Sequence, residues 1–169
     1  VCLTARISGS TGRRARGGIL AYAITSGNLV RVSLFNEVGL YDEGFFVDLV
    51  DFDFSLRLRK EGRAVHRVPD AVMHHYVGDV APSRGFLRRF YTQHSAVRRY
   101  YQYRNFLYLV ERYGLGFPAF IAKLSIAQMI HLLLIGIQDP QPLSSYRAIA
   151  YGVRDYLARR QGPWVEGSR

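Results

Sequence analysis

The chain has 169 residues, of which 49% are apolar, so its length and composition exclude wholesale disorder and fit one domain with a sizeable core. Its 23 Lys and Arg outnumber 13 Asp and Glu, giving a formal charge of +10, and nearly all of the cations are Arg. Because guanidinium groups bind phosphate and carboxylate, this charge indicates an anionic partner; charge alone leaves open nucleic acid, an anionic membrane surface or a diphosphate-bearing substrate.

The cysteine content and the amino terminus bear on the location of the protein. The single cysteine, Cys2, excludes an intramolecular disulfide and a Cys-x-x-Cys metal pair, which favours a reducing, cytoplasmic environment. No charged segment followed by an apolar run opens the chain, so no signal peptide is predicted, and the lack of a starting Met suggests a fragment. Residues 1–18, with a basic cluster at 13–16, are expected to be a flexible lead-in or the remnant of an upstream domain.

Residues 19–83 predict an α/β domain, because brief apolar runs alternate there with turn-forming residues. The expected elements are a strand at 19–25, a helix at 29–38 that ends at Gly39, a helix that begins near Asp48 and ends at Gly62, and two strands at 64–68 and 71–73 on either side of a Pro69-Asp70 turn.

Residues 84–169 predict a helical extension of three long helices. These are expected at about 95–113, 119–137 and 146–160, with Gly and Pro residues marking the breaks between them.

The middle helix raises the question of a membrane. It is apolar over 125–137, but Gln128 and His131 interrupt the run and Lys123 precedes it, leaving fewer than the ~20 residues that span a bilayer. Two interpretations stay open. One is an interfacial helix pair lying peripherally on anionic lipid at the inner face of the cytoplasmic membrane, and the other is a buried helical hairpin.

Three carboxylates, Asp48, Asp51 and Asp53, fall within six residues directly before an apolar helix. In a structural interpretation Asp48 caps the helix and the other two lie in its first turn, where the macrodipole favours negative charge. In a functional interpretation one carboxylate, kept ionised by the helix amides, is a general base that deprotonates an alcohol. The spacing of the three carboxylates does not decide between the structural and the functional interpretation.

Two further motifs also have both kinds of interpretation. His74 and His75 follow on a strand, where neighbouring side chains point to opposite faces, so at most one of them joins a site. A neutral imidazole suits Mn²⁺ and similar ions, although a lone strand histidine is commonly structural. The tripeptide Ser26-Gly27-Asn28 offers either exposed amides for close backbone approach or an ordinary turn.

Several segments share order and spacing with a known protein family. They are Thr-Ser-Gly-Asn-Leu at 25–29, Glu-Val-Gly-Leu-Tyr-Asp-Glu at 37–43, Phe-Val-Asp-Leu-Val-Asp-Phe-Asp-Phe-Ser-Leu-Arg at 46–57, Val-Pro-Asp-Ala-Val-Met-His-His at 68–75 with Gly78-Asp79, His94-Ser95 with Arg98, Tyr100-Tyr101 and Arg104-Asn105, and Tyr-Gly-Val-Arg-Asp-Tyr at 151–156 with Gly162. Over residues 19–162 they resemble the C-terminal half of glycosyltransferase family 2, in its rhamnosyltransferase-like branch.

The resemblance implies the acceptor-side portion of a GT-A (Rossmann-like) α/β domain followed by a helical extension. It implies inverting transfer of a sugar, typically rhamnose from dTDP-rhamnose, to a hydroxyl of a glycan or lipid-linked acceptor in cell-surface polysaccharide synthesis. Asp51 matches the base, although Val50 stands where the family has the first acid of a Glu-Asp pair. The implied substrate-binding positions are Ser26, Gly27, Asn28, Asp53 and Arg104, the last by a bidentate contact to a phosphate.

The resemblance also implies a divalent metal, Mg or Mn. His75 falls where the family places a histidine that completes the metal site. The family's main ligands form an Asp-x-Asp motif in its N-terminal half, together with the nucleotide-binding strands. Asp51-Phe52-Asp53 has that spelling but the context of the base motif, so we expect the main ligands to be absent and this chain alone to be inactive.

Two rival functions come from other classes of protein. The chain as it stands would be a non-catalytic fragment whose basic helices bind a membrane or an assembly partner. Alternatively it would bind nucleic acid, as the interleaved Arg and Tyr residues at 98–104 suggest, but no recognised binding motif accompanies them and we expect no nucleic-acid partner.

Overall fold

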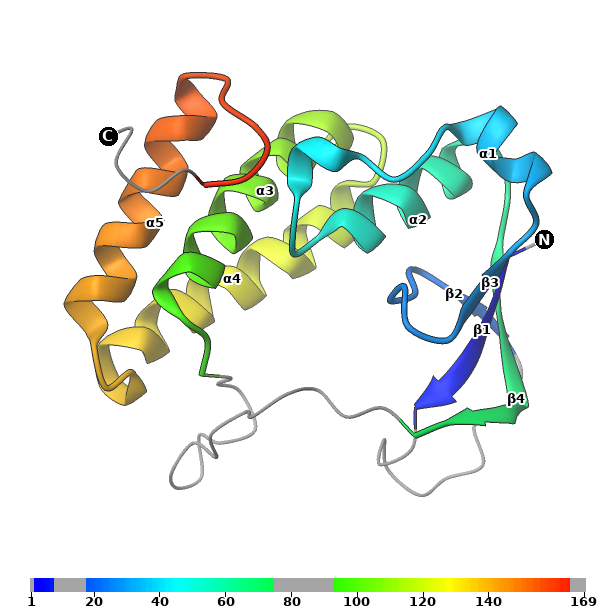
Figure 1. Ribbon diagram of the computed structural model, residues 1–169, viewed down its shortest axis with the longest axis horizontal. Helices are drawn as coiled ribbons and strands as arrows, with labels where there is room; N and C mark the ends of the chain where they lie inside the picture. Colours follow the sequence, from blue (N-terminus) through cyan, green and yellow to red (C-terminus); the bar gives the residue numbers. More distant parts are fainter. Residues whose placement is uncertain (1, 8–17, 75–92, 165–169) are drawn as a thin grey trace. The chain divides into compact units, whose positions relative to one another are not determined.

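The computed structural model describes residues 2–7, 18–74 and 93–164 (Figure 1). The chain forms two compact units, each described below by itself. The first comprises Val1–Asp42 and Val50–Val77, and the second comprises Glu43–Leu49 and Gly78–Arg169. The mixture of strands and helices expected from the sequence is confirmed. The segment Glu43–Leu49 is notable because it precedes a helix of the first unit in sequence yet belongs to the second.

Four strands form the sheet of the first unit, in the order β2-β4-β1-β3. Strand β1 (Cys2–Ile7) pairs in parallel with β4 (Val65–Met73) and antiparallel with β3 (Asn28–Val30), and β2 (Gly18–Leu20) pairs antiparallel with β4. Cys2–Ile7 is thus an ordered strand with a neighbour on each side and not a flexible segment, while the alternative that residues 1–18 are the remnant of an upstream domain stays a prediction. The basic cluster at 13–16 lies outside the described residues.

Two α-helices complete the first unit, α1 (Ser33–Val38) and α2 (Val50–Lys60). Helix α1 ends at Gly39, as predicted, because this residue takes a φ of 80° and its N–H donates to the carbonyl of Phe35 over 2.9 Å. Strands and helices bury a common apolar core, which consists of Cys2, Ala23, Leu34, Phe54, Leu58 and Val65.

Three elements differ from the sequence-based expectations. The strand expected at 19–25 is limited to Gly18–Leu20. Residues expected to start a helix at 29 instead form β3, because pairing with β1 competes with the local helical pattern. The two strands expected around Pro69 are a single strand, β4, in which pairing with β1 jumps from Val68 to Val72, so the proline lies in an irregular stretch that does not need its N–H.

The second unit contains the short 3₁₀ helix η1 (Glu43–Phe45) and three long helices where three were predicted, although the last begins four residues and ends three residues before its predicted bounds. They are α3 (Ala96–Tyr113), α4 (Pro118–Gln138) and α5 (Pro142–Leu157). Ser95 caps α3 by accepting the N–H of Arg98 at 3.3 Å, and prolines occupy the first turns of α4 and α5, where their missing N–H costs nothing. Among the described helices, α4 alone is long and apolar enough to cross a bilayer, and 22% of its apolar stretch is buried.

Helices α3 and α5 approach closely at Gly152. A Cβ at this position would lie 2.6 Å from the carbonyl oxygen of Tyr100, so only glycine fits between the two helices. The hydroxyl of Tyr100 donates to the buried carboxylate of Asp155 over 2.7 Å. After α5 the chain returns to α3, where the ring of Trp164 lies 5.0 Å from that of Tyr100 and the backbone N–H of Trp164 donates to the hydroxyl of Tyr101.

Candidate active site

Asp51, the predicted base, lies in the first turn of α2. It is half-buried, and its Oδ1 accepts the N–H of Phe52 over 3.0 Å. The helix amides and the macrodipole favour the charged carboxylate at this position. Burial raises the pKa of the nearby Tyr41 phenol, and Cys2 and then the carboxylate of Asp51 add smaller effects in the same direction. A charged, accessible carboxylate at a helix start is a suitable proton acceptor.

Asp53 has a different environment from Asp51. It is fully buried, and its Oδ2 accepts from Nε of Arg57 over 2.9 Å. Arg57 also donates to the carbonyls of Val38 and Leu40, at the end of α1. Asp53 therefore orients Arg57, which connects α2 to the end of α1. Asp53 thus has a structural role, and its role in substrate binding stays a prediction.

The residues predicted to line the substrate pocket form a turn that is fastened to α2. Asn28 donates its N–H to the carbonyl of Thr25 over 3.2 Å, and Gly27 takes a φ of 69°. Earlier in the same loop, the N–H of Ala23 donates to Oγ of Ser55 over 3.3 Å.

A ring contact brings this loop next to the predicted base. Tyr22 stacks on Phe52 with ring centroids 4.0 Å apart, and Phe52 directly follows Asp51. The structure thus brings the loop at 22–28 and the start of α2 together, although they are more than twenty residues apart in sequence. Within the loop, Asn28 is held by Cys2, whose thiol donates to Oδ1 over 3.1 Å.

The segment Glu43–Leu49, which leads in the chain to Asp51, has an unusual backbone. Phe46, Asp48 and Leu49 have φ angles of 58°, 61° and 62°, in the left-handed region that residues other than glycine seldom adopt. Such conformations persist where surrounding contacts enforce them, and they concentrate at functional sites. The second unit supplies those contacts from helix α3.

Asn105 of α3 is one source of these contacts. Its Nδ2 lies 2.8 Å from the carbonyl oxygens of Phe45 and Val47 and 2.9 Å from that of Asp48. The side chain is fully buried. The amide group of Asn105 therefore contacts three carbonyl oxygens of the segment Glu43–Leu49.

Arg104, predicted to bind a phosphate, lies beside Asn105 and is 1% exposed. Its guanidinium donates to the carbonyls of Gly44 and Gly162, each over 2.8 Å, and contacts the hydroxyl of Tyr100 at 3.3 Å. In the structure this arginine binds the protein's own backbone. Binding of a phosphate by Arg104 stays a prediction, and it would require these contacts to give way.

The carboxylate of Asp48 forms an ion pair with Arg98, in the first turn of α3. Arg98 contacts both of its carboxylate oxygens, with Nε and Nη2 each at 2.9 Å. The sequence offered Asp48 as a possible N-cap of α2. In the structure its carboxylate is instead engaged by Arg98. Arg98 and Asn105 carry no predicted role, although both belong to the segments that carry the family resemblance.

The predicted metal ligand His75 lies outside the described residues, and its neighbour His74 is exposed. In the part of the chain that the structure describes, no three His, Cys, Asp or Glu side chains lie close enough together to hold a metal ion. Asp53 is moreover committed to Arg57. The described residues therefore do not form a metal site by themselves.

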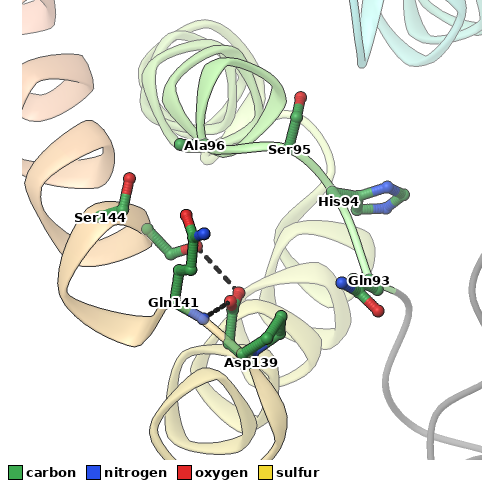
Figure 2. A pocket seen from close by; sticks show the side chains of 9 residues that line it. Gln93, His94, Ser95, Ala96, Asp139, Gln141 and Ser144 are labelled. Carbon is green, nitrogen blue, oxygen red and sulfur yellow. Dashed lines mark hydrogen bonds between the residues drawn. The ribbon is translucent and has the colours of Figure 1, made fainter.

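A pocket of about 340 Å³ opens in the second unit where the start of α3 meets the turn between α4 and α5 (Figure 2). Gln93, His94 and Ser95 line one side, and Gln141 and Ser144 line the other. Burial, with the nearby charges of Arg98 and Arg99, lowers the pKa of His94 to about 4, so its imidazole is neutral at pH 7. No motif of the sequence predicts this pocket.

The second wall of the pocket is fixed by Asp139. Its carboxylate accepts the N–H of Gln141 over 2.9 Å and the hydroxyl of Ser145 over 2.8 Å, as the dashed lines in Figure 2 show. These bonds hold the turn between α4 and α5 in place.

Comparison with known proteins gives one clear similarity. A dTDP-rhamnosyl transferase RfbF from Shigella flexneri is 35% identical to this chain over 112 residues, which are 66% of the chain and 37% of that protein. The chain thus spans well under half the length of this relative. No protein-family model and no solved structure matches the chain. The similarity supports a relationship to a rhamnosyltransferase.

Proposed function

We propose that the chain is the acceptor-side part of an inverting family 2 glycosyltransferase of GT-A fold. In this proposal the enzyme transfers rhamnose from dTDP-rhamnose to a hydroxyl of a glycan or lipid-linked acceptor. The observation that carries the proposal is the half-exposed Asp51 at the start of α2, with the loop at 22–28 fastened beside it. Similarity to a dTDP-rhamnosyl transferase supports the donor.

In the proposed reaction Asp51 accepts the acceptor's hydroxyl proton. The freed oxygen forms a bond to the anomeric carbon, from the face opposite the diphosphate. The bond from that carbon to the diphosphate oxygen breaks, and its electron pair leaves with the diphosphate. Configuration at the anomeric carbon is therefore inverted. Ser26, Gly27 and Asn28 would line the sugar pocket.

The other residues of the site position Asp51. Asp53 and Arg57 join α2 to the end of α1, and Tyr22 packs on the residue that follows the base. The resemblance also implies a divalent metal with His75 among its ligands. Because the described residues supply no complete ligand set, we assign no step to a metal.

The test compares Asp51→Asn with the parent in the natural full-length protein, using dTDP-rhamnose and its acceptor. We expect kcat to fall by about 10²- to 10⁴-fold, which is the usual contribution of a general base, with little change in donor KM. The matched control is Asp70→Asn, because Asp70 is exposed on β4. Near-normal turnover of Asp51→Asn would overturn the assignment of the base.

A further inference from the structure

We propose that the outer face of the α4–α5 hairpin docks on the surface of an anionic phospholipid bilayer, with α4 lying along the interface and not crossing it. The proposal rests on exposed apolar side chains and on the sign of the charges around them. It does not depend on the proposed function.

Helix α4 exposes large apolar side chains where a helix that faces water carries polar ones. Its exposed large side chains recur every three or four residues and so lie on one side of the helix. They are Ile126, Met129, Ile130, Leu133 and Ile137, of which the last two are 69% and 72% exposed.

The buried side of α4 carries polar groups beside apolar ones, because Gln128 and His131 are buried there together with Ile121, Leu134 and Ile135. His131 accepts from Nη1 of the buried Arg99 over 2.6 Å, and the carbonyl of Gln128 accepts the hydroxyl of Tyr103 over 3.0 Å. The outer side of α4 is thus apolar although its buried side already carries both polar and apolar groups, and this is the arrangement expected of a helix whose outer side meets lipid.

Helix α5 continues the same surface. Tyr146 of α5 donates its hydroxyl to the carbonyl of Leu132 in α4 over 3.0 Å, so this side of α5 adjoins α4. Leu143, Tyr146, Ala150, Val153 and Leu157 recur at intervals of three and four residues and are exposed. We call the exposed apolar stripes of α4 and α5 together the hairpin face.

The charges around the hairpin face select an anionic surface. Lys123, Arg147 and Arg154 are exposed. Arg147 and Arg154 each follow an apolar residue of the α5 stripe by four positions, so they border the stripe, and their aliphatic stems allow the charge to reach headgroups. Between Pro118 and Leu157, all of which the structure describes, the carboxylates are Asp139 and Asp155, whose side chains are 5% and 0% exposed.

A second copy of the chain suits the hairpin face less well than a bilayer. Self-association through one face would bring the same basic border of two copies together, with no exposed carboxylate on the hairpin to balance it. Insertion of α4 across the bilayer is also disfavoured, because the buried side of α4 packs against α3, which carries Arg98, Arg99 and Arg104. Moving charged groups into the hydrocarbon core is costly.

The experiment is co-sedimentation of the 169-residue chain with lipid vesicles. We expect binding to vesicles of phosphatidylglycerol and phosphatidylcholine, weakening as salt is raised, and little binding to phosphatidylcholine alone. Arg147→Gln and Arg154→Gln should each weaken binding about fivefold, the equivalent of one basic residue at the surface.

The apolar contribution is tested by placing a charge on the hairpin face. Leu133→Asp should weaken binding at least tenfold, whereas Val32→Asp, at an equally exposed apolar position of the first unit, should leave it unchanged. Circular dichroism verifies that each variant is folded. A fluorophore on Ile126→Cys gives a second measurement in a chain without the added charge, since the native Cys2 is buried and protected from labelling.

Several outcomes would overturn the proposal. They are equal binding to neutral vesicles, unchanged binding of a folded Leu133→Asp variant, or no change in the emission of the Ile126→Cys label when anionic vesicles are added. A chain that forms dimers, fails to bind vesicles and becomes monomeric on Leu133→Asp would show that the hairpin face binds another copy. A blue shift of the label only with anionic vesicles would support docking.

Discussion

The guanidinium of Arg98 holds the carboxylate of Asp48 at two points, with Nε 2.9 Å from Oδ2 and Nη2 2.9 Å from Oδ1. The pair joins the start of α3 to a residue whose φ is 61°. It therefore helps to enforce a backbone conformation that a residue with a side chain seldom adopts.

Asp48→Asn tests this ion pair while preserving the size of the side chain. We expect the free energy of unfolding to fall by about 1–2 kcal/mol, because a bidentate charged contact becomes a neutral one. Urea unfolding measures the change. The control is Glu37→Gln, which removes a more exposed pair with Arg63 and should cost less than ~0.5 kcal/mol. Equal losses would show that the Asp48 pair has no special role.

Asn105→Ala tests the support of the segment Glu43–Leu49. The change removes the side-chain donor of the carbonyls of Val47 and Asp48, so we expect a loss of roughly 2–4 kcal/mol from several weakened bonds. Hydrogen exchange within 43–49 should speed up in parallel. The control is Gln102→Ala, one turn earlier on α3. If amide hydrogens at 43–49 stayed as well protected from exchange in Asn105→Ala as in the parent, the role assigned to Asn105 would be wrong.

Gly152→Ala tests the close approach of α3 and α5. The added methyl would lie 2.6 Å from the backbone of Tyr100, which is too close, so the helices must separate. We expect a loss of about 1–3 kcal/mol and a lower Tm, as for overpacking elsewhere. Gly116→Ala is a matched control because its added methyl meets no atom within 4 Å. If both variants melted alike, the packing at Gly152 would be looser than described.

His94 makes stability depend on pH. Burial, followed by the charges of Arg98 and Arg99, lowers its pKa from 6.5 to about 4. The unfolded chain therefore binds a proton at a pH where the folded chain does not, so the free energy of unfolding falls as pH drops from 6.5 toward 4. His94→Gln should flatten this dependence in urea titrations between pH 4.5 and pH 7, the range being set by the same two values. His74→Gln, at an exposed position, should leave it as it is. A parental slope in His94→Gln would mean that other groups cause it.

The long helices could be predicted from sequence because their signals are local. Ser95 and Pro118 lie at the predicted starts of α3 and α4, whereas α5 begins at Pro142, within the predicted break and four residues before its predicted start. Strands β1 and β3 could not be predicted in the same way. Each is short, and each exists because it pairs with residues far along the chain, such as Leu3 with Leu29.

The family resemblance names candidate site residues, but the contacts of these residues could not be predicted from sequence. Family resemblance singled out Asp51, and the structure places it accessibly at a helix start. The same resemblance singled out Arg104, yet its partners Gly44 and Gly162 lie about sixty residues away on either side. The left-handed backbone at Phe46 could not be predicted from a local pattern, because bulky residues seldom adopt a positive φ.

The packing of Trp164 has a practical consequence. It is the only tryptophan in the chain, and it lies against Tyr100 of α3. Its emission spectrum therefore reports on the helical unit alone, while far-ultraviolet circular dichroism reports on both. Unfolding curves recorded by the two signals will coincide if the sheet and the helices melt as one cooperative body, and they will separate if each melts independently.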